Sequence, residues 1–178
     1  MEGSFLKKVV IYYITILAYT KLKISFKGKI IALGGCYGKS SAIKLIENVL
    51  STEHNIYSSD RNGKGLNSES GIPFVILGIT PSQYRFQDWL RYAIASTGSL
   101  FSKFDPEVLL LEFGVDRPND MKHLVTFFRP DIGILINSNN THSANFERLQ
   151  ETTKETFERL IAKENGYIFE NAKEAILY

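Results

Sequence analysis

The sequence lacks several features that would assign it to a specialised class of protein. Its 178 residues include a single cysteine, Cys36, which excludes an internal disulfide and is compatible with a reducing compartment. It has no internal repeat and no low-complexity tract, and its 44% hydrophobic content excludes a wholly disordered or fibrous chain. The length predicts one domain, with or without an added terminal element.

The chain has almost no excess of charge of either sign. It holds 21 Lys and Arg against 19 Asp and Glu, for a net charge of +2. The distribution is uneven, because residues 1–50 hold eight lysines against Glu2 and Glu47. A basic N-terminal third suits an anionic partner such as a phosphate group or a membrane surface, with simply solvated lysines as the alternative. We expect no nucleic-acid partner.

A hydrophobic run long enough to cross a bilayer is also lacking. The longest run lies within residues 5–20, between flanking lysines, and is shorter than the roughly 20 apolar residues of a spanning helix. It has no convincing small-residue cleavage site, which argues against a secretory signal. Two interpretations stay open: a helix packed on the domain, which we favour, or an interfacial helix whose tyrosines and lysines lie among lipid headgroups.

From Lys29 onward, strand and helix patterns alternate. Short apolar runs predict buried strands at 29–33, 108–114, 132–137 and 167–169. Helices are predicted over 40–50, from Pro73 at a first helical turn, and over 86–100, 118–128 and 147–163. Continuous apolar strands separated by helices are typical of a mostly parallel sheet covered on both faces. The predicted fold class is therefore α/β, a three-layer sandwich.

The strongest motif follows the first of these strands and precedes a helix. It reads Gly35-Cys36-Tyr37-Gly38-Lys39-Ser40-Ser41. Glycines let backbone N–H groups curl around phosphate oxygens, and a helix N-terminus adds the positive end of its dipole. Lys39 would reach the β- and γ-phosphates of ATP, and the Ser40 hydroxyl would ligate Mg²⁺. The strict pattern requires glycine where this chain has Leu33, and a turn with incidental glycines is the alternative interpretation.

This short loop, Gly-x-x-Gly-Lys-Ser, resembles the one in the central ATPase domain of the Mur ligase family. Three further segments resemble that family in the same order. They are Asn67-Ser68-Glu69-Ser70-Gly71-Ile72-Pro73, Leu111-Glu112-Phe113-Gly114-Val115-Asp116-Arg117-Pro118, and Arg129-Pro130-Asp131 continuing to Asn137 and Thr141-His142. The second is most similar to the D-alanyl-D-alanine-adding branch. The resemblance covers about residues 28–170 and implies a P-loop NTPase-like fold.

The resemblance implies roles for individual residues. Glu112 follows a strand, where ligands bind in open α/β sheets, and would share Mg²⁺ with Ser40. His142 would bind a second Mg²⁺ together with a carbamylated lysine, for which Lys154 is the best candidate, and Asn137 would lie near the nucleotide. Lys39, Glu112 and His142 are therefore the predicted catalytic residues. An exposed histidine and an ordinary surface lysine are the alternatives for His142 and Lys154.

The chain also departs from that family. Ala144 stands where the family usually has an acidic residue, and only residues 1–27, an apolar and basic helical segment, precede the predicted ATP-binding domain at 28–178. The complete ligases have an N-terminal domain and a C-terminal domain that this chain is expected to lack. The resemblance therefore implies the core of a cytoplasmic peptidoglycan-precursor ligase that uses ATP, Mg²⁺ and a UDP-muramoyl peptide, with a partner supplying the missing domains.

Three functions follow from these observations. The first is an ATP-dependent carboxylate–amine ligase, or its ATPase core, that works through an acyl phosphate. The second is a nucleotide-binding partner subunit or degenerate paralogue without ligase activity. The third is an unrelated P-loop NTPase such as a small kinase, against which the segments around Glu112 and His142 count.

Overall fold

The computed structural model describes residues 2–35, 38–60, 66–68, 70–82, 85–114, 120–136 and 167–169. Within these ranges, helices alternate with short strands in the way that the hydrophobic pattern predicts. The elements in chain order are α1 (Glu2–Ser25), β1 (Lys29–Gly34), α2 (Lys39–Leu50), β2 (Ile56–Ser58), α3 (Gly71–Leu77), α4 (Phe86–Ser99), β3 (Val108–Glu112), α5 (Asp120–Phe127), β4 (Ile132–Leu135) and β5 (Tyr167–Phe169).

The strands form one sheet in the order β2-β3-β1-β4-β5, and every neighbouring pair is parallel. β1 is central, between β3 and β4. In its register Leu33 lies opposite Glu112 of β3 and Ile134 of β4. The carboxyl ends of β1 and β3 therefore meet at one edge of the sheet, which confirms the predicted parallel α/β fold.

Both faces of this sheet are buried, which explains why its strands are apolar without alternation. In β1 the side chains of Ile30 and Ala32 enter one hydrophobic cluster, while those of Ile31 and Leu33 enter the other. Successive side chains of a strand point to opposite faces, so a strand covered on both faces needs an apolar residue at every position. β3 is also buried at all five positions, and its first four residues follow the same rule, with Glu112 at its carboxyl end as the exception.

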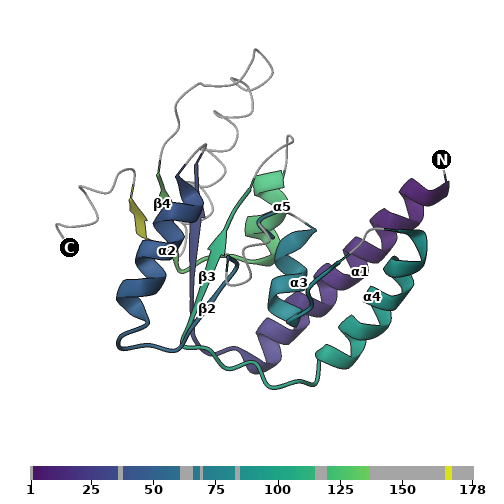
Figure 1. Cartoon of the computed structure of the whole chain (residues 1–178), viewed down its shortest axis with the longest axis horizontal. Helices are drawn as coiled ribbons and strands as arrows, with labels where there is room; N and C mark the ends of the chain where they lie inside the picture. The colour runs from purple at the N-terminus through teal and green to yellow at the C-terminus, as the bar shows by residue number, and fades with distance from the viewer. Residues whose placement is uncertain are drawn as a thin grey trace, which may run out of the picture.

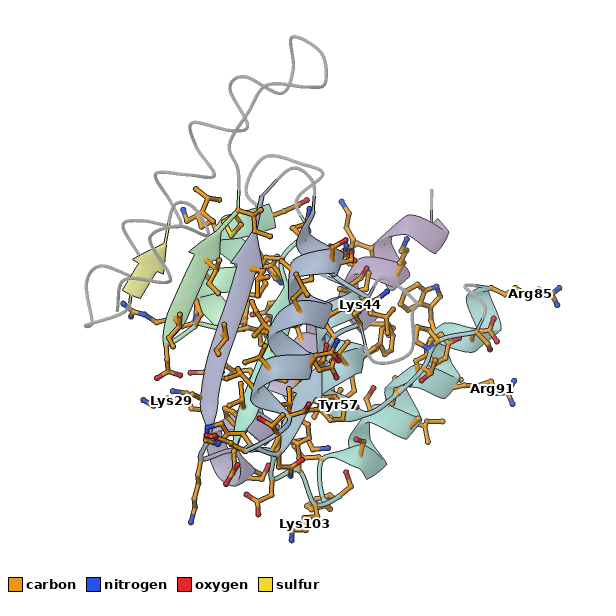
Figure 2. All side chains as sticks on the ribbon, turned by 60° about the vertical axis from the view of Figure 1, so that its left-hand side comes forward. Lys29, Lys44, Tyr57, Arg85, Arg91 and Lys103 are labelled. Atoms are coloured by element: carbon orange, nitrogen blue, oxygen red, sulfur yellow. The ribbon has the colours of Figure 1, made fainter. Side chains whose placement is uncertain are left out.

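Helices cover the two faces unequally, as Figure 1 shows. Among the described helices, α2 is the one that lies on the first side, where Ile43 is its fully buried contact with the cluster containing Leu110. α3 and α5 lie on the other side, and α1 and α4 run side by side beyond α3. Figure 2 shows the α2 side of the sheet, with Lys44 on that helix and Lys29 at the beginning of β1. The three-layer sandwich is thus extended by a further pair of helices.

The N-terminal helix packs on the domain through one side only. Ile14, Ala18 and Leu22 are buried in the same hydrophobic cluster as Phe74 of α3 and Trp89 of α4. Within the residues that the structure describes, no helix is long and apolar enough to cross a membrane. The predicted helix and its packing are confirmed, and the outer side of α1 is left exposed.

Several boundaries differ from the predicted ones. α2 begins at Lys39 rather than at a serine, and α5 is described from Asp120 rather than from residue 118. The strand β2 was not predicted, because Ile56–Ser58 is short and runs directly into a polar stretch that resembles a loop. The helix predicted at 147–163 lies outside the described residues.

One buried side chain in the helical layers is charged. Lys21 of α1 is 2% exposed, and its Nζ donates to Ser102 Oγ at 2.9 Å and to Ser99 Oγ at 3.3 Å. The Phe104 ring centroid lies 5.2 Å from the same nitrogen. Burial lowers the pKa of Lys21 from its ordinary value, while the C-terminal end of α4, at Ser99, favours a nearby cation.

The lowered pKa of Lys21 predicts that the stability of the fold changes with pH in the alkaline range. The unfolded chain holds this proton more tightly than the folded chain, so folding releases it between the lowered pKa and about 10.4, and stability rises with pH there. We expect the free energy of unfolding of the wild type, measured relative to Lys21→Met, to increase with rising pH up to about pH 10. Urea unfolding at each pH tests this, and a constant difference would contradict it.

Candidate active site

The candidate site lies where the carboxyl ends of β1 and β3 meet the beginning of α2. Ligands bind in open α/β sheets at this edge, beyond the carboxyl ends of the strands. The loop between Gly35 and Lys39 follows β1, and Glu112 is the last residue of the adjacent β3. Parallel pairing, rather than any nearness in sequence, therefore brings the loop and the carboxylate together.

The glycines of the loop take up conformations that other residues rarely adopt. Gly35 has φ of 137° and Gly38 has φ of 81°. Gly38 is the N-cap of α2, and its carbonyl oxygen accepts the N–H of Ala42 at 2.9 Å. A Cβ at Gly38 would meet only the Ile136 side chain at 3.9 Å, so the need for glycine is conformational rather than steric. Cys36 and Tyr37 lie outside the described residues.

Lys39 is the first residue of α2 and turns back over this loop. Its Nζ donates to the carbonyl oxygen of Gly35 at 2.7 Å. The contact places a positive charge beside the N-terminal end of α2, where the helix dipole also favours an anion. Ser40 and Ser41 follow in the first turn of the same helix.

Glu112 is a buried carboxylate whose two oxygens each accept a hydrogen bond. Its side chain is 5% exposed. Oε2 accepts from Ser40 Oγ at 2.9 Å, and Oε1 accepts from Asn67 Nδ2 at 2.9 Å. Its backbone N–H donates to Ser59 Oγ, also at 2.9 Å. A buried carboxylate needs such partners because an unsatisfied one is costly, and here they come from two separate segments, the start of α2 and the segment before α3.

The pair formed by Ser40 and Glu112 fits two neighbouring positions around a magnesium ion. Mg²⁺ binds oxygens at 2.0–2.1 Å in an octahedron, so adjacent ligand oxygens are separated by about 2.9 Å. The distance from Ser40 Oγ to Glu112 Oε2 matches that separation. Across the described part of the chain, no three His, Cys, Asp or Glu side chains cluster as a metal site. The fit therefore rests on one carboxylate and one hydroxyl.

Two contacts of Glu112 were not predicted as such. Asn67 belongs to a segment quoted only for its resemblance, and Ser59 follows the strand β2 that the pattern missed. Asn67 also accepts the N–H of Gly114 with its backbone oxygen at 2.6 Å. The sequence signal for Asn67 is that resemblance, and the signal for Ser59 is only its polarity beside a predicted loop.

The structure brings part of the predicted site together. Ser40 and Glu112 are in contact, and Gly35, Gly38, Lys39 and Ser41 belong to the same loop and helix end. The predicted nucleotide contact Asn137 and the predicted metal ligands His142 and Lys154 lie outside the described residues. Their roles stay predictions.

The site and the sheet define a class of protein, a parallel α/β fold with a glycine loop between β1 and α2. Comparison with solved structures narrows the class to the fold of Mur ligases. The chain is similar to the MurF ligase of Thermotoga maritima in complex with ADP, with a TM-score of 0.61 and 22% identity over 94% of this chain and 34% of that one. No family model matches the chain.

Two structures from Acinetobacter baumannii are similar in the same way. MurF from that organism gives a TM-score of 0.56 at 14% identity, over 85% of this chain and 32% of that one. A second structure, named UDP-N-acetylmuramoylalanyl-D-glutamyl-2,6-diaminopimelate–D-alanyl-D-alanyl ligase, gives 0.51 at 14% identity, over 93% and 34%. The resemblance predicted from the motifs is thus confirmed as a shared fold, and the chain spans about a third of the length of these ligases.

Close packing around Asn67 predicts a pairwise effect on stability. A Cβ at Gly114 would lie 2.9 Å from Asn67 Cγ and 3.0 Å from Asn67 Oδ1. We expect Gly114→Ala to cost about 1–3 kcal/mol in the wild type. The same change in an Asn67→Ala background should cost at least about 0.5 kcal/mol less, because the nearest side-chain atoms are gone. Urea unfolding of the four proteins measures the difference, and equal costs would show that the two residues do not press on each other.

Proposed function

We propose that residues 28–178 are the ATP-binding core of a Mur-type ligase, preceded by the helical segment 1–27. Such a ligase joins a carboxylate to an amine at the expense of ATP, in the synthesis of peptidoglycan precursors. The observation that carries the proposal is the contact between Ser40 and Glu112 beside a glycine loop, at the edge of a parallel sheet. The similarity to a MurF ligase in complex with ADP supports the same assignment.

In this proposal the loop and its lysine hold the phosphates of ATP. Backbone N–H groups at the start of α2 point toward the loop, and Lys39 neutralises charge on the β- and γ-phosphates. Ser40 and Glu112 hold Mg²⁺, which would draw negative charge from the phosphate oxygens. Asn67 keeps the Glu112 carboxylate oriented through its 2.9 Å hydrogen bond. Asn137 is proposed to contact the nucleotide.

The proposed reaction has two steps. A carboxylate oxygen of the substrate attacks the γ-phosphorus, so that an acyl phosphate forms and ADP leaves. An amine then attacks the acyl carbon, an amide forms, and inorganic phosphate leaves. His142 and carbamylated Lys154 are proposed to hold a second Mg²⁺ near this intermediate, and a UDP-muramoyl peptide is the proposed carboxylate substrate. We place the reaction in the cytoplasm, where ATP is available.

Completion of the reaction requires surfaces beyond those described. An acyl phosphate must be kept from water until the amine arrives. The chain covers only about a third of the similar ligases. We therefore propose that further domains, in a longer chain or in a partner protein, present the carboxylate substrate and close over the nucleotide.

A second candidate function is nucleotide binding without ligation, as a partner subunit or degenerate paralogue. The observation that favours it is Ala144, which replaces the acidic residue usual in the family beside His142. Both functions use Lys39, Ser40 and Glu112 for the nucleotide, and they differ only in the second metal and the acceptor. An unrelated P-loop NTPase is disfavoured by the fold shared with MurF ligases.

Nucleotide binding is tested by replacing the lysine of the loop. We expect Lys39→Ala to weaken binding of a fluorescent Mg-ATP analogue by about 10- to 100-fold, since a charge-assisted hydrogen bond contributes about 1.5–3 kcal/mol. Glu112→Gln should remove the gain in affinity that Mg²⁺ gives the wild type, because an amide is a poorer ligand than a carboxylate. Fluorescence anisotropy with and without Mg²⁺ measures both effects.

The matched control lies on the same helix. Lys44 is exposed on α2, where it pairs with Asp60 at 3.5 Å away from the loop, so Lys44→Ala should leave nucleotide affinity within about twofold of the wild type. If Lys39→Ala and Lys44→Ala weakened nucleotide binding equally, the loss would be explained by the change in net charge and not by a contact in the loop. Unchanged affinity in both variants would remove the phosphate-loop assignment.

Ligation is tested separately from binding. We expect the 178-residue chain alone to form no pentapeptide from UDP-muramoyl tripeptide and D-alanyl-D-alanine, while hydrolysing ATP slowly. Liquid chromatography follows the peptide product, and a phosphate assay follows hydrolysis. Pentapeptide formed by this chain without a helper would make it a minimal ligase, and would contradict the need for further domains.

A further inference from the structure

Large hydrophobic side chains are exposed together on the outer sides of α1 and α4. We name the set of these residues the helix-pair face. Their exposed fractions run from 36% at Tyr19 to 84% at Phe101. The face consists of Phe5, Val9, Tyr12, Tyr13, Ile16 and Tyr19 on α1, Leu90 and Ile94 on α4, and Phe101 just after α4.

The helix-pair face is one surface because the two helices are fastened to each other. α1 and α4 run side by side at the end of the molecule away from α2 (Figure 1). Tyr13 Oη and Thr97 Oγ1 form a hydrogen bond of 2.8 Å across the pair. The inner sides of the same helices are buried through Ala18 and Trp89. The exposed rows are therefore additional to the domain core.

Basic residues border this apolar surface. Residues 2–27 hold four exposed lysines and the buried Lys21 against Glu2, and residues 85–103 hold Arg85, Arg91 and Lys103 against Asp88. These two segments carry a net charge of +6, whereas the whole chain carries +2, so the rest of the chain is acidic. Figure 2 shows Arg85 and Arg91 pointing outward from α4. Lys7, Lys8, Lys23 and Lys27 are exposed on and just after α1.

We propose that the helix-pair face is a docking surface for a membrane containing anionic phospholipids. Its apolar side chains would enter the boundary between headgroups and acyl chains, while the bordering lysines and arginines contact lipid phosphates. Tyrosine rings suit that boundary because one end is apolar and the other is polar. The proposed contact is peripheral, because it uses only the outer sides of helices whose inner sides are buried in the domain.

The charge on the face favours lipid over a second copy of this chain. A symmetric pair would place the same basic borders opposite each other, and like charges repel at an interface. An anionic lipid surface complements both the apolar centre and the basic border. Each exposed lysine or arginine near such a surface is expected to strengthen binding by about fivefold.

Flotation of the full chain with vesicles tests the proposal. We expect the wild type to float with vesicles of phosphatidylcholine and phosphatidylglycerol, and to float poorly with phosphatidylcholine alone or at high salt. Leu90→Glu combined with Ile94→Glu should reduce flotation by at least tenfold, because two charges would enter the apolar centre. Both side chains are 67% exposed, so the folded core is untouched, and circular dichroism checks the fold.

The chain offers a closely matched control pair on α2. Leu45 and Val49 are also four residues apart on a helix and are 67% and 69% exposed. Leu45→Glu combined with Val49→Glu should float as the wild type does. The proposal would be overturned if the wild type floated with neither kind of vesicle. It would also be overturned if the two double variants lost flotation equally. Light scattering that shows a lipid-free dimer broken by Leu90→Glu and Ile94→Glu would instead assign the face to self-association.

Discussion

The burial of the Glu112 carboxylate is the constraint on which the rest of the site depends. A carboxylate at the end of a central strand can be buried only if its oxygens have partners, because an unsatisfied charge costs several kcal/mol. Ser40 supplies one hydrogen bond from the start of α2, and Asn67 supplies the other from the segment before α3. The carboxylate therefore determines where two otherwise separate segments must lie.

The same arrangement explains where side chains are excluded. Asn67 can reach Glu112 only because Gly114 leaves room, since a Cβ there would lie 2.9 Å from Asn67 Cγ. Gly38 has a different reason, because its φ of 81° turns the chain into α2 and a Cβ would be strained even in open space. Gly114 is thus required for close packing, and Gly38 is required for the turn of the backbone. Both act on the ends of the segments that meet at the sheet edge.

The sequence allowed the fold to be predicted where the hydrophobic pattern is continuous. β1 and β3 are buried on both faces, so their apolar runs were unambiguous. β2 was missed because three residues beside a polar stretch carry no such pattern. In the site, Ser40 and Glu112 could be predicted because each lies beside a strong signal. Asn67 and Ser59 could not be predicted as partners of Glu112, since their contact depends on the path of loops between distant strands.

The position of α1 shows how one helix can satisfy two opposing demands. A helix that is apolar on all sides is normally buried, yet α1 packs through Ile14, Ala18 and Leu22 and leaves its opposite side exposed. Packing on α3 and α4 stabilises the helix without removing that outer side from water. The helix α2, which begins at Lys39, lies on the other side of the sheet from α1 (Figure 1). In the two proposals taken together, a membrane would contact α1 and α4 while the nucleotide would bind at the start of α2, so variants of one surface are expected to leave the other unchanged.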